Sequence, residues 1–294
     1  MKIMNRFNSK ILLFGEYGII KGSKGLALPF DSFFGEIVVG ESKTSESMRV
    51  FVQTMMRSSI LKREIDFKNV ENDIEQGLVF KSNIPQGFGL GSSGALCAAL
   101  FDQYSLNFKR KNRFEEKELS FIQEILSIME STFHGTSSGL DPLISYMDTP
   151  LLIEKGDKVS VIKKPELSVF GQFYLLDTKI QRKTSPLVHQ FLKDCSDEKY
   201  LAGIQKYMSL TNLVIDNLLD KQVDSFAINF REISRLQYLY FESMIPASLK
   251  EVWLRGLESR DYFMKLCGAG GGGFFLVFTS NGNVPSDFDL LRLT

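Results

Sequence analysis

A glycine- and serine-rich segment at residues 85–95 has the composition of an anion-binding loop. It reads Pro-Gln-Gly-Phe-Gly-Leu-Gly-Ser-Ser-Gly-Ala. Glycines at alternate positions let the main chain approach an anion closely. The first amides of a helix have no partner within that helix, so a helix starting at the serines would present donors to phosphate oxygens. Taken alone, the segment fits equally well an ordinary turn that caps a buried helix.

The flanking residues favour the order strand, loop, helix. Residues 78–83 alternate apolar and polar side chains like a strand, and residues 95–101 are rich in alanine and leucine, which form helices readily. The spacing does not fit the P-loop, which requires Gly-x-x-x-x-Gly-Lys-Ser/Thr. It also differs from the Gly-x-Gly-x-x-Gly pattern of dinucleotide-binding folds. The segment therefore indicates a phosphate-binding loop of another kind.

The pattern Pro-x-x-x-Gly-Leu-Gly-Ser-Ser resembles the second motif of the GHMP kinases, in which this loop holds the phosphates of ATP. Residues 10–17, Lys-Ile-Leu-Leu-Phe-Gly-Glu-Tyr, look like the first motif of that family. Residues 265–274, Lys-Leu-Cys-Gly-Ala-Gly-Gly-Gly-Gly-Phe, are similar to its third motif. Because apolar, strand-like segments flank this glycine run, we interpret it as a structured loop and not as a flexible linker. The motifs occur in family order and span almost the whole chain.

Two further segments resemble the mevalonate kinase branch of the family. Residues 130–141 contain a glutamate followed by His-Gly-x-x-Ser-Gly-x-Asp, and residues 177–184 end in a threonine that lies near substrate and phosphate in that branch. The resemblance implies that Glu130 binds magnesium and that Asp141 faces the acceptor hydroxyl. Homoserine kinases lack the aspartate, so its presence argues against that branch.

These resemblances imply ATP and Mg²⁺ as cofactors and a set of site residues. Asp141 is the expected catalytic group, with Lys10 beside it to stabilise its negative charge. The residues expected to bind ATP are Gly87, Gly89, Leu90, Gly91, Ser92, Ser93 and Gly94. The residues expected to bind the acceptor are Glu16, Tyr17, Thr184 and Gly270, and those expected to hold magnesium are Ser93 and Glu130.

The expected reaction is ATP-dependent phosphorylation of the 5-hydroxyl of mevalonate, a step of isoprenoid precursor biosynthesis. Tyr17 departs from the histidine usual in mevalonate kinases and matches phosphomevalonate kinases, and residues 28–31 replace the usual Asn-Leu. Phosphomevalonate, a sugar or the decarboxylating reaction therefore stay open as alternatives. A non-catalytic metabolite sensor would have lost the aspartate, the lysine or a metal ligand, and this chain retains them.

The composition is that of a globular protein without a basic footprint. The chain has 294 residues, 44% hydrophobic and 24% charged, with a formal net charge of zero. We expect no nucleic-acid partner, and no membrane contact because no run approaches about 18 apolar residues. The odd number of cysteines, Cys97, Cys195 and Cys267, shows no metal-binding spacing and predicts a reducing cytoplasm. A homodimer stays open, and most phenylalanines have the spacing of core residues.

The predicted fold is α+β, the two-lobed GHMP kinase fold with the active site in the cleft between the lobes. We expect an N-terminal ATP-binding domain at residues 1–165 and a C-terminal domain at 166–294. The expected strands are 10–14, 34–39, 49–53, 78–83, 150–154, 159–162, 170–177, 263–267 and 274–278. The expected helices are 92–105, 114–130, one after Asp141, and a helical stretch over 184–258 that breaks at Pro246.

Overall fold

The computed structural model describes residues 5–111, 114–156, 158–182 and 184–293. The strands are β1 Phe7–Phe14, β2 Gly25–Val39, β3 Leu78–Ser82, β4 Leu151–Glu154, β5 Lys158–Val161, β6 Gln172–Asp177, β7 Phe263–Leu266, β8 Phe274–Thr279 and β9 Leu290–Arg292. The helices are α1 Glu46–Met55, α2 Leu61–Glu64, α3 Phe67–Glu75, α4 Ser92–Tyr104, α5 Glu116–His134, α6 Leu140–Met147, α7 Thr184–Asp194, α8 Glu198–Leu219, α9 Val223–Tyr240 and α10 Ala247–Ser259. Short 3₁₀ helices cover Gly18–Lys21, Leu167–Val169 and Glu242–Met244.

The chain forms two compact units, each assembled from separate stretches of sequence. Unit 1 comprises Met1–Lys10, Leu28–Pro85 and Leu90–Pro150, and unit 2 comprises Ile11–Ala27, Gln86–Gly89 and Leu151–Thr294. Strands β1 and β2 therefore contribute residues to both units. The chain passes from unit 1 to unit 2 for the last time after Pro150, and not at residue 165. The assignment of family domains to 1–165 and 166–294 stays a prediction.

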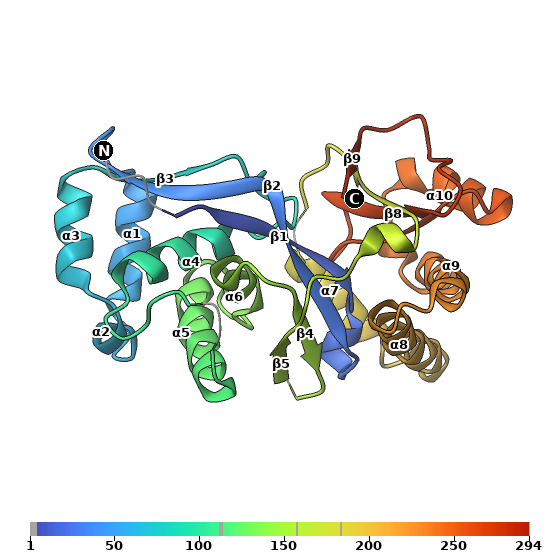
Figure 1. Cartoon of the computed structure of the whole chain (residues 1–294), viewed down its shortest axis with the longest axis horizontal. Coiled ribbons are helices and arrows are strands. Elements are labelled where there is room, and N and C mark those ends of the chain that lie inside the picture. The colour runs from blue at the N-terminus through green and yellow to red at the C-terminus, as the bar shows by residue number, and fades with distance from the viewer. Residues whose placement is uncertain (1–4, 112–113, 157, 183, 294) are drawn as a thin grey trace. The chain divides into compact units, whose positions relative to one another are not determined.

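Unit 1 packs helices against an antiparallel strand pair. Strand β2 pairs with β3 so that Gly35 lies opposite Ser82 and Val39 opposite Leu78. Helices α1, α4, α5 and α6 lie on one side of this pair, and α4 contacts both α5 and α6 (Figure 1). Helix α4 is buried over most of its length because small residues such as Ala95 and Ala98 let its neighbours approach closely. It begins at Ser92, the first serine of the glycine–serine segment, as the sequence predicts.

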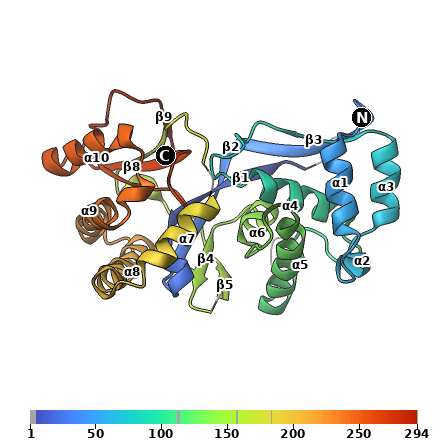
Figure 2. The same cartoon turned by 180° about the vertical axis from the view of Figure 1, so that it is seen from behind.

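Unit 2 contains a four-stranded sheet in the order β7-β8-β6-β9. Strand β8 is buried at every residue. Helices α9 and α10 pack on β7, and α8 lies alongside α9 (Figure 2). Ring contacts between sheet and helices fill the core of the unit, with the residues Phe14, Phe173, Phe226, Phe230 and Phe278. The prediction that phenylalanines serve as core residues is confirmed for this cluster.

The strand predicted at 49–53 is wrong, because these residues belong to helix α1. Its buried residues Met48, Phe51, Val52 and Met55 recur at helical spacing. The side chain of Ser45 accepts a hydrogen bond from the Met48 amide and starts the helix. The short run of β-branched and aromatic residues at 50–52 imitates a strand over a window too short to distinguish the two periods.

The remaining expected elements occur near their predicted positions, and the break at Pro246 is confirmed. Helix α9 ends at Tyr240, and α10 begins immediately after Pro246, whose ring fixes the backbone ahead of the first turn. Helices α2 and α3 and strand β9 were not anticipated. Within the described part of the chain, no helix is both long and apolar enough to span a membrane.

Candidate active site

Lys10 and Asp141 form an ion pair in unit 1, as the sequence predicts. The Lys10 ammonium lies 3.0 Å from Oδ1 of Asp141. Lys10 is 8% exposed, whereas the Asp141 side chain keeps 37% of its surface exposed. Asp141 lies in the first turn of α6, where the helix dipole favours a negative charge. The carboxylate is thus held from one side and accessible from another.

Glycines allow the elements that carry this pair to approach each other. A Cβ at Gly94, on α4, would lie 2.8 Å from the main-chain carbon of Asp141, too close for any side chain. A Cβ at Gly91 would lie 3.0 Å from Cγ of Lys10 and 3.6 Å from Oδ2 of Asp141. The Lys10 amide also donates to the Leu90 carbonyl at 3.0 Å. The predicted ATP-binding residues at the start of α4 therefore lie against the predicted catalytic pair.

Glu130 lies near the end of α5 with both carboxylate oxygens in contact with serine hydroxyls. Ser93 Oγ donates to Oε1 at 3.1 Å, and Ser137 Oγ donates to Oε2 at 2.5 Å. The side chain is 5% exposed. Burial raises the pKa of Glu130 to about 7, with a further contribution from the negative charge of Asp141.

The donor set around Glu130 fits a magnesium ion. Mg²⁺ prefers oxygen ligands and takes one or two protein groups together with water and substrate phosphates. The hydroxyl of Ser93 and the carboxylate of Glu130 are adjacent oxygen donors of this kind. Among the described residues, no cluster of three or more histidine, cysteine or acidic side chains offers a denser metal site.

The preceding part of the loop, Gln86–Gly89, lies in unit 2 against Arg182. The Arg182 amide donates to the Gly87 carbonyl at 3.0 Å. A side chain at Gly89 would collide with the guanidinium of Arg182, and a Cβ at Gly268 would lie 2.8 Å from its Nη2. Both glycines therefore leave space for one cation, which sequence analysis did not assign to the site.

The glycine run at residues 268–273 is a structured loop between β7 and β8. The Gly271 amide donates to the Met244 carbonyl at 2.6 Å, and the Gly273 amide donates to the Ile180 carbonyl at 2.7 Å. A flexible linker would leave these amides to solvent, so the predicted loop is confirmed. The backbone of this loop is fixed by neighbours distant in sequence.

Tyr17 connects the end of the first motif to this glycine loop within unit 2. Its hydroxyl donates to the Ala269 carbonyl at 2.5 Å, next to the predicted acceptor-binding residue Gly270. Its ring packs against Phe191 and Phe241 at centroid distances of 4.8 and 5.2 Å. Burial raises the pKa of the Tyr17 hydroxyl, so it stays a neutral donor at physiological pH.

Glu16 has a different environment from the other predicted acceptor-binding residues. It is 1% exposed, and its carboxylate accepts from the ammonium of Lys265 and from the hydroxyl of Tyr207. Burial raises the pKa of Glu16, although the neighbouring Lys265 lowers it in part. Direct contact between Glu16 and an acceptor stays a prediction, and this burial favours an indirect role.

Two groups beside the predicted site were not assigned from the sequence. Ser137 lies within segment 130–141, and Arg182 lies within segment 177–184. A hydroxyl near a motif glutamate and a cation near a glycine loop are the signals that could have identified them. The predicted acceptor-binding residue Thr184 begins α7, and its side chain lies outside the described residues.

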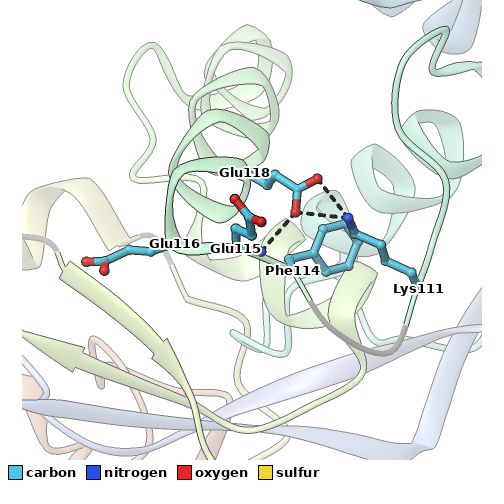
Figure 3. Close-up of a pocket in the computed structure, with 5 residues that line it drawn as sticks. All are labelled: Lys111, Phe114, Glu115, Glu116 and Glu118. Atoms are coloured by element: carbon cyan, nitrogen blue, oxygen red, sulfur yellow. Dashed lines mark hydrogen bonds and ion pairs between the residues drawn. The ribbon is translucent and has the colours of Figure 1, made fainter.

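A pocket at the opposite end of α5 contains none of the predicted site residues. Its lining residues are Lys111, Phe114, Glu115, Glu116 and Glu118. Figure 3 shows Lys111 paired with Glu118, which also accepts from the Glu115 amide. These contacts cap the start of α5. The negative charge of this pocket makes it unsuited to a nucleotide phosphate.

Comparison with known proteins shows similarity to the GHMP kinases. Residues 52–149 match the family model of the GHMP kinases N terminal domain. The similarity extends to mevalonate kinase from Homo sapiens, 26% identical over 226 residues, which cover 67% of this chain and 52% of the human protein. The aligned region thus spans about half the length of that relative.

Solved structures show the same fold over nearly the whole chain. A mevalonate kinase crystal structure superposes with a TM-score of 0.66 at 20% identity, covering 99% of this chain and 98% of the other. Streptococcus pneumoniae phosphomevalonate kinase, in complex with phosphomevalonate and AMPPNP, gives 0.63 at 14% identity, covering 95% and 92%. The predicted α+β GHMP kinase fold is confirmed, and the location of the active site in a cleft between lobes stays a prediction.

Proposed function

We propose that this chain is an ATP-dependent small-molecule kinase that phosphorylates the 5-hydroxyl of mevalonate. The observation that carries the proposal is the pair of Lys10 and Asp141, 3.0 Å apart, in the same unit as Ser93 and Glu130. A cation, a half-exposed carboxylate and an oxygen pair suited to magnesium are the groups that phosphoryl transfer to a hydroxyl requires. The similarity to human mevalonate kinase supports the choice of acceptor.

In this proposal, Asp141 orients the acceptor hydroxyl and accepts its proton, while the phosphoryl group passes from ATP to the hydroxyl oxygen. Lys10 keeps the carboxylate in place and stabilises its charge. The protein otherwise acts by positioning, since the transferred group distributes its charge over its own oxygens. Tyr17, Thr184 and Gly270 remain our candidates for holding the acceptor.

The nucleotide is assigned to the segment from Gly87 to Gly94. The amides at the start of α4 would donate to phosphate oxygens, and the guanidinium of Arg182, beside Gly89, would balance their charge. Ser93 and Glu130 would hold magnesium, which neutralises phosphate charge when it is bound. These proposed roles use groups that belong to the loop or contact it.

Phosphomevalonate is the second candidate acceptor. The observation that favours it is Tyr17, whose type matches phosphomevalonate kinases and whose hydroxyl is held by the Ala269 carbonyl. A phosphorylated acceptor needs a cationic pocket, so the two acceptors differ by the charge they bring to the site.

A coupled assay of ADP formation with mevalonate, phosphomevalonate, galactose and homoserine tests the proposal. We expect turnover with mevalonate that depends on magnesium and disappears with EDTA. The Asp141→Asn variant controls for contaminating kinases, because its nucleotide binding should persist while turnover is lost. If phosphomevalonate or galactose is turned over faster than mevalonate, that compound is the acceptor instead. If no acceptor is turned over, the proposed kinase activity is rejected.

A further inference from the structure

A buried polar network in unit 2 joins the first and third glycine motifs. The ammonium of Lys265, on β7, donates to Glu16 and also to the Leu266 carbonyl at 2.6 Å. Both side chains of the Glu16–Lys265 pair are 0% exposed. The Lys265 ammonium also lies 5.3 Å from the ring centroid of Phe14, a position that favours a cation. No atom of the pair is available to a ligand.

Helices α8 and α9 complete the network. Tyr207 Oη lies 3.2 Å from both the main-chain oxygen and Oε2 of Glu16, and Gln237 Nε2 donates to Tyr207 at 3.0 Å. Gln237 Oε1 accepts from the Leu266 amide at 2.7 Å. Both main-chain polar groups of Leu266 are therefore held by side chains of the network.

The two anchored ends lie directly before the parts of unit 2 that we assign to acceptor binding. Glu16 precedes Tyr17, whose backbone has a φ of 56°, a value that residues other than glycine rarely adopt. Leu266 is followed by Cys267 and then by the glycine loop at residues 268–273. Glycines alone would leave this loop many conformations, so its geometry must be imposed by neighbours.

Stability alone does not explain the network. Removing two charges from water is costly, and replacing a buried ion pair with apolar side chains of similar volume is often neutral or stabilising. Such a pair can instead restrict the surrounding backbone to one conformation, because any conformation that separates the charges leaves each of them buried without a partner.

We propose that Glu16 and Lys265 are positioning residues that fix the glycine loop at 268–273 and Tyr17 in the conformation that binds the acceptor. Tyr207 and Gln237 hold the pair in its orientation. The expected change in the KM for mevalonate rests on the proposed function. The expected change in the mobility of the glycine loop does not depend on turnover.

The test uses the double variant Glu16→Gln/Lys265→Met, which removes both charges and leaves no buried ion unpaired. We expect the protein to fold with a melting temperature near that of the wild type. Amides of the glycine loop should exchange with solvent about tenfold faster, whereas those of β6 keep their rates. The KM for mevalonate should rise about tenfold, while the KM for ATP stays within about twofold.

A matched control is Asp216→Asn, which breaks the partly exposed ion pair of Lys24 and Asp216 in the same unit. It should change neither loop exchange nor the KM for mevalonate. If the double variant fails to fold, Tyr207→Phe removes one hydroxyl of the network and should accelerate loop exchange by about threefold. Unchanged loop exchange in a folded network variant would overturn the proposal. Absence of turnover in the wild type, with loop exchange still accelerated in the variant, would reject only the kinase function.

Discussion

Two lysine–carboxylate pairs, one in each unit, differ in exposure. In unit 1, the Asp141 side chain beside Lys10 keeps 37% of its surface exposed. In unit 2, the side chains of Glu16 and Lys265 are both 0% exposed. A group that takes a proton from a substrate needs an accessible face, whereas a buried and fully hydrogen-bonded pair can only hold its neighbours. We therefore propose a chemical role for the exposed pair and a positioning role for the buried one.

The largest expected effect comes from the exposed pair. Asp141→Asn should lower kcat by about 10³–10⁴ or more, because general base and positioning contributions are both lost. Nucleotide binding, measured by calorimetry, should change little. Asp148→Asn is the matched control at the other end of α6, where Asp148 has a φ of 51° that asparagine also tolerates. An active Asp141→Asn protein would remove this residue from the mechanism.

The buried pair should dominate stability instead. Lys265→Met leaves the Glu16 carboxylate buried without its cation and should lower the free energy of unfolding by about 3–5 kcal/mol. Lys10→Met should cost under about 1 kcal/mol, because water can reach the half-exposed Asp141. Urea denaturation of both variants compares them directly. Equal losses of stability would mean that exposure does not separate the two pairs.

A third prediction concerns how the stability of the protein depends on pH and on magnesium at Glu130. The pKa of Glu130 is raised to about 7 from its ordinary 4.5, so between these values the folded chain keeps a proton that the unfolded chain releases. Stability should therefore fall as the pH rises from 4.5 to 7 and level off above 7. The loss amounts to about 3 kcal/mol, since each pKa unit corresponds to about 1.4 kcal/mol.

The Glu130→Gln variant isolates this effect, because glutamine does not titrate. In EDTA, thermal unfolding of the wild type should lose stability relative to the variant across this pH window. Adding magnesium above pH 7 should restore stability to the wild type alone, because the ion binds the charged carboxylate. Parallel pH profiles of the two proteins would contradict the raised pKa.

The smallest expected effect is at Tyr17. This residue is buried like Glu16, but it lies next to the proposed acceptor site. Tyr17→Phe removes the hydrogen bond to the Ala269 carbonyl and keeps the ring contacts. We expect a loss of stability of about 1 kcal/mol, the usual contribution of a neutral hydrogen bond, and a KM for mevalonate raised less than about tenfold. A larger rise in KM with unchanged stability would indicate direct contact between the hydroxyl and the acceptor.

The sequence predicted the parts of the site that depend on local pattern. The three glycine motifs and the segment ending in Asp141 have fixed spacing, so resemblance was sufficient to select Lys10, Ser93 and Glu130 as candidates. In the structure, Lys10 contacts Asp141, and Ser93 contacts Glu130. The fold class followed from the same motifs, and the structural comparisons confirm it. The strand predicted at 49–53 failed because helix α1 is defined by burial over a longer window.

The contacts that were missed join residues far apart in the chain. Glu16 and Lys265 are separated by 249 positions, and neither helix partner, Tyr207 or Gln237, belongs to a motif. No local pattern reports such a pairing, since it appears only when several elements pack together. Glu16 was accordingly interpreted as a substrate ligand by analogy with its motif, while its burial depends on the fold.

Strand β1 has a consequence for tolerance to changes in chain length. Lys10 lies within the strand and Glu16 lies just after its end. One short backbone segment therefore carries one member of the Lys10–Asp141 pair and one member of the Glu16–Lys265 pair. Because strand side chains alternate between faces, inserting or deleting a single residue inside β1 after Lys10 would reverse the faces of the residues that lead from Lys10 to the end of the strand. Surface loops absorb such changes at little cost. We therefore expect relatives that keep both pairs to align through residues 10–16 without a gap.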